Sequence, residues 1–274
     1  MDTRDLSRAA LAGALALVAA LGGAQAASAQ SRALQSIKTV VIDPGHGGHN
    51  DGAQGHRGSV EKDLALAVAY AARDQLRRDY PDLRVVLTRN LDIDLSLPDR
   101  IHTAHMAEAD LFLSLHMNSS TNLEAEGVEV FYLSTDKSMP MVTRGEGTWG
   151  QAFEDPDEGV PSGAMRHGTS GDALPRILLD LERARSHADS AVLAETLLEE
   201  LRRACGGCRN RGVRQANFGV LRGSLVPSAV VEFGFISHPT EERRLIRDET
   251  HKRFAKAISR TVERMDAIFA AHEY

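Results

Sequence analysis

The chain is poor in three features, and each shortage excludes a class of protein. Only two of its 274 residues are cysteines, too few for a structural zinc site built from thiolates alone. Basic residues are not in excess: the formal net charge is −6, which argues against a nucleic-acid ligand, because such ligands require a clustered basic face. After the N-terminal residues, no apolar run approaches the ~20 residues of a membrane span. The sequence also contains no internal repeat.

The N-terminal residues have the three parts of an export signal. Arg4 and Arg8 precede an almost wholly apolar run at 9–22, which is too short for a membrane span but typical of a signal peptide. Ala27-Ser28-Ala29 offers a small-x-small cleavage site, and Ala24-Gln25-Ala26 is a second candidate. We therefore expect residues 1–29 to be removed and residues 30–274 to form one soluble domain in the periplasm. The alternative is a frayed alanine-rich helix in a cytoplasmic protein.

The two cysteines, Cys205 and Cys208, are spaced Cys-x-x-Cys in ACGGCRN. In an exported protein this spacing favours a short local disulfide that closes a glycine-rich turn. Free structural thiols and a redox-active pair are the alternatives, although no β-α-β pattern surrounds the cysteines as it would in a thioredoxin-like protein.

Short β-type runs alternate with longer helical patterns, which predicts an α/β fold: a central, mostly parallel mixed β-sheet with α-helices on both faces. Strands are expected at residues 37–43, 83–88, 111–115, 127–133 and 228–233. Helices are expected at residues 61–80, 97–108, 173–204 and 241–271. The run at 111–115 is wholly apolar apart from Ser114 and should be buried on both sides, whereas the alternation at 127–133 suggests a place nearer an edge. Residues 134–172 are rich in Gly, Pro, Ser and charge and should form a surface insertion.

Four polar residues adjoin these apolar elements. His46 follows the first strand in VVIDPGHGG, His116 ends FLSLH, Glu232 lies within AVVEFGF, and Glu61 begins the first helix. Ligands of open α/β sheets gather at the carboxyl ends of the strands, so we expect these side chains to converge. Two imidazoles and one carboxylate meet the needs of a catalytic zinc, which keeps an open position for water. Taken singly, each has a plainer explanation: a turn histidine, a hydrogen-bonded core histidine, or an acid at a helix start.

Glu232 carries the most information because a carboxylate between Val231 and Phe233 in a buried strand must be paired, metal-bound or functional. Burial would raise its pKa toward the range useful for proton transfer. The competing interpretation is a carboxylate neutralised by Arg214 or Arg222. We expect Glu232 to act as a general base.

Four segments together resemble the zinc-dependent N-acetylmuramoyl-L-alanine amidases of the amidase 3 type: VVIDPGHGG, GSVEKDL, ADLFLSLHMNSS and VPSAVVEFGFISHPTEE. The resemblance implies that His46, Glu61 and His116 bind one Zn²⁺ and that Glu232 is catalytic. It also implies hydrolysis of the amide between N-acetylmuramic acid and L-alanine of peptidoglycan. The sequence departs from the pattern at three positions, which leave the shape of the pocket open but do not affect the metal ligands: Met117, Phe233 and His238.

In periplasmic relatives of this type, the stretch corresponding to 134–172 often carries an autoinhibitory helix that a partner at the division septum releases. Here that stretch is poorly helical, and inhibition through an acid within it is a weaker hypothesis, the candidates being Glu146, Glu154 and Glu158. No separate wall-targeting domain is expected. Asn118 and Ser114 would orient the metal ligands or serve as strand-end caps. Two other functions stay open: a different zinc peptidase of the cell wall, such as a carboxypeptidase, and a catalytically silent wall-binding module.

Overall fold

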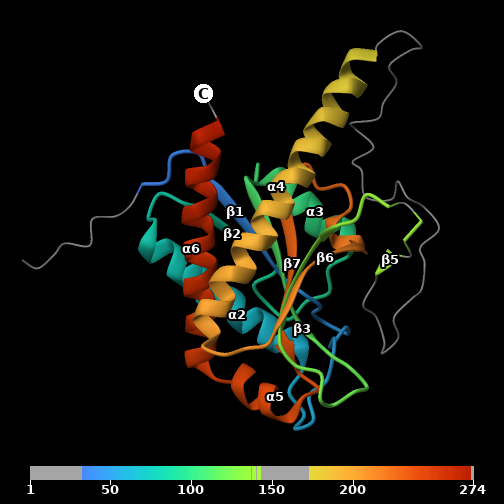
Figure 1. The fold of residues 1–274 in the computed structure, drawn as a ribbon, viewed down its shortest axis with the longest axis vertical. Helices are drawn as coiled ribbons and strands as arrows, with labels where there is room; N and C mark the ends of the chain where they lie inside the picture. Colours follow the sequence, from blue (N-terminus) through green and yellow to red (C-terminus); the bar gives the residue numbers. More distant parts are fainter. Residues whose placement is uncertain (1–32, 137, 140, 143–172, 273–274) are drawn as a thin grey trace, which may run out of the picture. The chain divides into compact units, whose positions relative to one another are not determined.

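The computed structural model describes residues 33–136, 138–139, 141–142 and 173–272 (Figure 1). The predicted signal peptide and the three candidate inhibitory glutamates of the 134–172 stretch lie outside these ranges. Within the described residues, no helix has both the length and the apolar character needed to cross a membrane.

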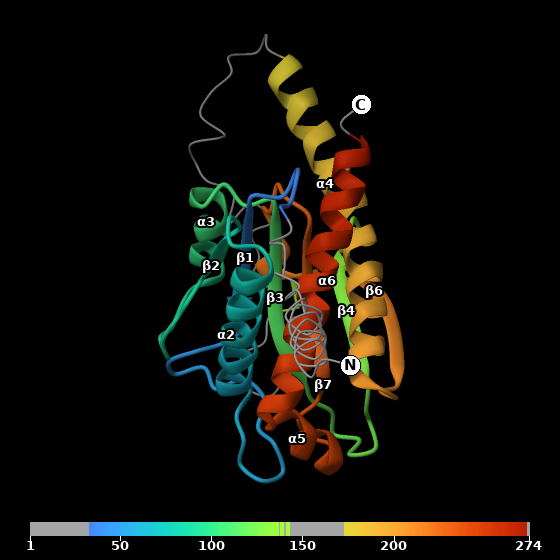
Figure 2. The ribbon, with the colours of Figure 1, turned by 90° about the vertical axis from the view of Figure 1, so that its left-hand side faces the viewer.

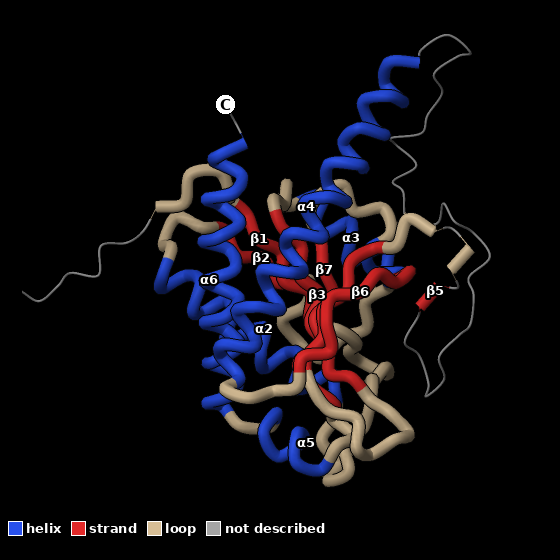
Figure 3. The backbone as a smooth tube through the Cα atoms, in the orientation of Figure 1, coloured by secondary structure: helices blue, strands red, loops and turns tan. Residues whose placement is uncertain are grey.

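A mixed β-sheet lies at the centre of the described part of the chain, and the predicted α/β fold is confirmed (Figure 3). Its seven strands, counted over the described residues, have the order β2-β1-β3-β7-β4-β6-β5. The strands span the following residues: β1 Thr39–Pro44, β2 Arg84–Leu87, β3 Leu111–Asn118, β4 Val128–Leu133, β5 Met141–Val142, β6 Asn210–Phe218 and β7 Ser228–Phe235. The helices span these: α2 Glu61–Asp79, α3 Leu97–Met106, α4 Ala173–Cys205, η1 Gly219–Leu221, α5 Pro239–Leu245 and α6 Asp248–His272.

The sheet consists of two parallel groups joined by one antiparallel pair. β2, β1, β3 and β7 are parallel to one another, β4 runs antiparallel to β7, and β6 and β5 run parallel to β4. The expectation that residues 127–133 lie nearer an edge was wrong, because β4 is hydrogen-bonded on both sides. β6 pairs with the side of β4 that was expected to be an edge. This strand was not predicted from the sequence because NRGVRQANF is polar and lacks a continuous apolar run.

Different helices cover the two faces of the sheet. α2, α6 and α4 lie side by side on one face, as both views show (Figures 1 and 2), and they enclose the larger apolar core with alternate residues of the strands. α3 and η1 cover part of the other face over a smaller core that includes Phe112, Val230 and Phe131. Because side chains alternate along each strand, successive residues of a strand belong to the larger core and to the smaller core in turn.

Two predictions about the C-terminal third have different outcomes. The predicted helix at 241–271 is divided into α5 and α6 by a break after Leu245. α5 begins at Pro239, and the His238 ring accepts hydrogen bonds from the backbone N–H groups of Thr240 and Glu241, each at 3.2 Å. The favoured pairing of the cysteines is confirmed: Cys205 and Cys208 form a disulfide at the end of α4.

Candidate metal centre

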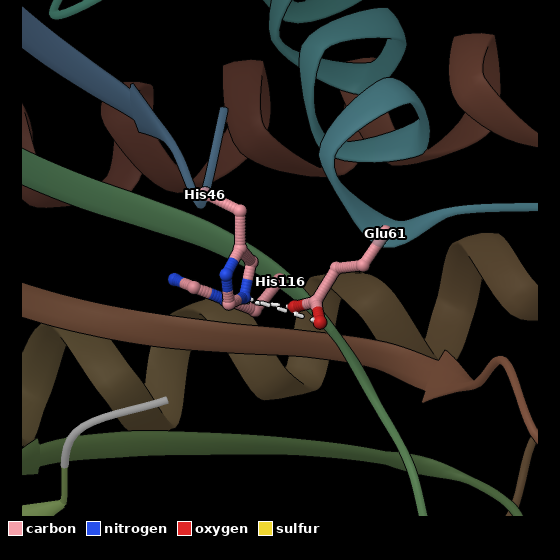
Figure 4. A group of neighbouring side chains, drawn as sticks. All are labelled: His46, Glu61 and His116. Atoms are coloured by element: carbon pink, nitrogen blue, oxygen red, sulfur yellow. Dashed lines mark hydrogen bonds and ion pairs between the residues drawn. The ribbon is translucent and has the colours of Figure 1, made fainter. Parts of the chain in front are cut away.

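Three side chains with metal-binding donor atoms meet at the carboxyl end of the first parallel group of strands (Figure 4). His46 comes from the loop after β1, Glu61 is the first residue of α2, and His116 lies near the end of β3. One donor atom of each lies within 4.8 Å of the others. Glu61 Oε2 is 3.2 Å from His46 Nε2, and Glu61 Oε1 is 2.8 Å from His116 Nδ1. The structure thus brings together the three residues that the sequence singled out.

The loop around His46 sets both its orientation and its tautomer. His46 adopts φ 58°, an uncommon conformation for a residue with a side chain. Its Nδ1 lies 2.9 Å from Asn50 Oδ1, which also accepts a hydrogen bond from the Gly52 N–H at 3.1 Å. Because an amide oxygen only accepts, His46 Nδ1 carries the proton and Nε2 keeps its lone pair. This is the tautomer that an Nε2 metal ligand requires.

Backbone groups from two other segments orient the Glu61 carboxylate. The Ala53 N–H donates to Oε2 at 2.8 Å, and the Met117 N–H donates to Oε1 at 3.0 Å. Each oxygen therefore has one fixed donor and faces one histidine. Glu61 is fully buried, so its orientation is set by these neighbours rather than by solvent.

Two glycines leave the space that the cluster occupies. A Cβ at Gly45 would lie 2.2 Å from His116 Cε1, and a Cβ at Gly52 would lie 2.7 Å from both Glu61 Oε2 and His46 Cδ2. Gly52 also has φ +70°, which side chains rarely adopt. The glycine-rich composition around His46 is therefore a steric requirement of the site.

Two buried arginines, which were not among the site residues predicted from the sequence, bind main-chain carbonyl groups of the loop. Arg100 donates to the carbonyl oxygens of Pro44 and His46, both at 2.8 Å. Arg89 donates to the carbonyl oxygens of Pro44 at 3.0 Å and Gly45 at 2.8 Å. The only sequence signal was their position, Arg89 directly after a strand and Arg100 in the first turn of a helix, and arginines there are ordinarily exposed.

The charge of Arg100 is balanced by Asp43, at the end of β1. Arg100 Nη1 lies 2.7 Å from Asp43 Oδ1, and the hydroxyls of Thr88 and Ser114 donate to the same carboxylate at 2.6 and 2.7 Å. Burial raises the pKa of Asp43, but Arg100 and the two hydroxyls outweigh that effect and hold the pKa below its usual range. The ion pair therefore stabilises the fold above the ordinary aspartate pKa and loses this contribution as the pH falls through the folded-state value.

Glu232 lies directly beside His116 in the sheet. The two residues are register partners on the parallel strands β7 and β3, and on its other side Glu232 is the register partner of Glu129 on β4. Register partners project to the same face of a sheet. Val230 and Phe112, which precede Glu232 and His116 by two and four residues, belong to the core under α3, so Glu232 and His116 point to this face as well. Glu232 is fully buried. Of the two arginines considered as its partners, Arg214 lies near Glu129, and Arg222 donates to Asn217.

The remaining predicted residues act less directly on the cluster. Ser114 donates to Asp43, while Asn118 donates to Glu129 and accepts from the backbone N–H of Ser119. The orienting groups identified for the cluster are instead Asn50 and two backbone N–H groups.

Two of the three departures from the amidase pattern have side chains in the larger apolar core. The side chains of Met117 and Phe233 are buried in the core under α2, α4 and α6, on the face opposite Glu232. His238 caps α5 through its ring nitrogen, which the amide oxygen of an asparagine could also do.

The donor set fits a zinc ion. Bonds of 2.0–2.2 Å to one ion place tetrahedral ligand atoms roughly 3.4 Å apart. The two histidine–glutamate distances, 3.2 and 2.8 Å, are close to this spacing. His46 Nε2 is buried and has no hydrogen-bond partner within the described part of the chain; its lone pair faces Glu61 Oε2. Two imidazoles and one carboxylate also match the ligand types that zinc prefers in hydrolytic enzymes.

Comparison with known proteins places this geometry in a family. The sequence profile described as N-acetylmuramoyl-L-alanine amidase (Amidase_3) matches residues 40–264, which include every residue of the cluster and Glu232. The chain belongs to this amidase family. Its enzyme class is therefore that of the N-acetylmuramoyl-L-alanine amidases, hydrolases that act on peptidoglycan.

Individual amidases of the family support this assignment. The chain is 35% identical to the amidase AmiA of Escherichia coli over 226 residues, 82% of this chain and 75% of AmiA. It is 33% identical to AmiC of Neisseria meningitidis, of which it covers 52%. Among solved structures, the amidase AmiC2 of Nostoc punctiforme has a TM-score of 0.60 at 27% identity, covering 83% of this chain and 96% of that one. The CwlV catalytic domain of Paenibacillus polymyxa has a TM-score of 0.61 at 26% identity, covering 83% and 97%.

Proposed function

We propose that this amidase is zinc-dependent, that His46, Glu61 and His116 hold one Zn²⁺, and that Glu232 is its general base. The observation that carries the proposal is the juxtaposition of two imidazoles and a carboxylate within 4.8 Å, beside a buried glutamate on the neighbouring strand. The reaction is hydrolysis of the amide that joins N-acetylmuramic acid to L-alanine of the stem peptide.

A zinc ion in such a site lowers the pKa of water and polarises the scissile carbonyl. Glu232 removes the proton from the attacking water and later delivers it to the leaving amine nitrogen. Its place beside His116 puts the carboxylate next to the ligand cluster, and its burial on a rigid central strand limits the directions from which it can exchange protons. Asn50 maintains the proton on His46 Nδ1 throughout.

The proposal extends to the setting of the enzyme. Residues 1–29 form a cleaved signal peptide, residues 30–274 form the catalytic domain with a surface insertion at 134–172, and the enzyme works in the periplasm. There it contributes to wall remodelling and daughter-cell separation, with a protein activator at the septum as a partner. The N-terminal composition and the wall amidases among its relatives support this setting.

The test is mass spectrometry of the products that the chain from Gln30 onward releases from purified sacculi, with and without a chelator. We expect free stem peptides beginning at L-alanine, lost with the chelator and in Glu232→Gln. Glu249→Gln is the matched control because Glu249 is an exposed glutamate of α6. Shortened stems that remain attached to glycan would indicate a peptidase instead. Absence of any release, with zinc supplied, would indicate either a catalytically silent module or an enzyme that requires its activator.

A further inference from the structure

A row of charged residues continues from Glu232 across β4 to β6. Glu129, the register partner of Glu232, is 3% exposed and accepts a hydrogen bond from Asn118. From β6, Arg211 Nε approaches Glu129 Oε2 at 3.2 Å and Arg214 Nε approaches the same oxygen at 3.8 Å. The register of β4 and β6 shifts opposite Glu129, where Gly212 adopts φ 93°. This shift leaves both arginines directed at one carboxylate.

Both arginines approach Glu129 through the Nε edge and toward the same oxygen, so the contacts with this carboxylate do not use their terminal nitrogens. The Arg211 Cζ lies 4.8 Å from the centre of the Phe235 ring, which fixes the plane of its guanidinium. Within the described residues, no hydrogen bond or ion pair engages Nη1 or Nη2 of Arg211. The Arg214 side chain is 52% exposed, and its Nη2 donates to the Arg211 carbonyl oxygen at 3.5 Å. Terminal guanidinium groups held in this way match the geometry of a carboxylate ligand.

We infer that Arg211 and Arg214 form a subsite for a carboxylate of the substrate peptide, two or three residues beyond the scissile amide. This inference rests on the proposed function, because it assumes that the peptide lies along the row from Glu232 to β6. The ligand class is a peptide with a free carboxylate. An amidated peptide would lose the charge-assisted hydrogen bonds.

The dimensions agree with this placement. Neighbouring strands are about 4.8 Å apart, so the β6 backbone lies on the order of 10 Å from that of Glu232. An extended peptide advances about 3.3–3.6 Å per residue, which carries its second or third residue about 7–10 Å from the scissile bond. Arginines that reach back from β6 to Glu129 fall within this interval.

The test uses the mature enzyme and two soluble muramoyl-peptides that differ only in having free or amidated peptide carboxylates. We expect a preference of about tenfold to a hundredfold in kcat/KM for the acidic substrate, the worth of one hydrogen bond between charged groups. Arg214→Met should abolish most of this preference by raising KM for the acidic substrate, with the amidated substrate unaffected. Arg211→Lys, which keeps the charge and loses the planar group, should lower the preference without unpairing Glu129.

Arg253→Met is the matched control, because Arg253 is 57% exposed and its Nε lies 3.9 Å from Glu249 on α6. It should leave the preference unchanged. Equal kcat/KM for the two substrates, or an equal loss on both in Arg214→Met, would overturn the subsite. Calorimetric binding of the acidic and amidated stem peptides separates this failure from failure of the proposed function. An enzyme that hydrolyses neither substrate but binds the acidic peptide more tightly, in an Arg214-dependent way, refutes the reaction and retains the subsite.

Discussion

Strands β3 and β7 present different chemistry on their two faces. Toward α2, α4 and α6, β3 places only apolar side chains, Leu111, Leu113, Leu115 and Met117, and β7 likewise places Ala229, Val231 and Phe233. Toward the α3 face, β3 changes along its length from Phe112 through Ser114 to His116. On the face covered by α2, α4 and α6, the apolar side chains of both strands serve only to pack the core. The α3 face packs at the amino end and carries the candidate chemistry at the carboxyl end.

Because side chains alternate between the two faces, one strand can contribute every second residue to the core and the residues between them to the candidate site. Neighbours in sequence belong to different layers: Val231 and Phe233 pack in the large core, whereas Glu232 between them lies beside His116 of the candidate metal centre. A substitution on one face should therefore leave the property of the other face largely intact. Four substitutions test that separation.

The largest effect is expected from Glu232→Gln. Loss of a general base lowers kcat by about a hundredfold to ten-thousandfold. The substitution keeps the shape of the side chain, so the thermal unfolding midpoint and the zinc content should match those of the parent enzyme. Steady-state kinetics with calorimetry and elemental analysis measure all three. A variant with reduced zinc content would mean that Glu232 also belongs to the ligand set.

Arg100→Met tests whether the α3 face is also structural. It leaves the buried Asp43 carboxylate without its cation, and breaking a buried ion pair costs about 3–5 kcal/mol of unfolding free energy. Urea unfolding measures the cost. The double variant Asp43→Asn with Arg100→Met should recover part of the stability, because the uncompensated charge is gone. A double variant no more stable than the single one would show that the carbonyl contacts to the His46 loop dominate.

On the helix face, Leu113→Ala should cost about 2–5 kcal/mol of unfolding free energy, because it opens a cavity in the core beneath the helices. At temperatures where the variant is folded, its kcat and zinc affinity should equal those of the parent. Urea unfolding and kinetics on the same preparation provide the comparison. A loss of kcat in the folded variant would break the separation of the two faces.

The smallest effect is expected from Asn50→Ala, which removes the acceptor that sets the His46 tautomer. Substitution of such a supporting residue lowers metal affinity by about 10–100-fold. Competition with a zinc chelator measures the affinity. Ser119→Ala provides a polar control whose side chain makes no hydrogen bond within the described residues. Equal affinity in Asn50→Ala and the parent would show that the loop backbone alone orients His46.

The sequence predicted the fold where apolar periodicity was strong. The strand at 111–115 and the helix at 61–80 correspond to β3 and α2 within a few residues. β6 was missed because it lies toward the end of the sheet, and its arginines and glutamine are accommodated by partial exposure rather than burial. The predicted helix at 241–271 did not show the break after Leu245 that separates α5 from α6.

The convergence of His46, Glu61 and His116 was predictable because each residue lies at a strand end or a helix start. The arginines that support them were not. Arg89 and Arg100 act through main-chain carbonyl groups, and no residue pattern encodes which carbonyl a long side chain will reach. The pairing of Glu129 with Glu232 depends on the antiparallel register of β4 and β7, which a local pattern does not determine.

The most direct test of the account is anomalous diffraction at the zinc absorption edge from crystals of the zinc-loaded enzyme. We predict a single peak about 2.0–2.2 Å from a nitrogen of His46, a nitrogen of His116 and an oxygen of Glu61. Glu232 should lie near the peak without coordinating it. A peak held by other residues, or no peak in protein that still cleaves peptidoglycan, would contradict the assignment of this cluster as the catalytic metal centre.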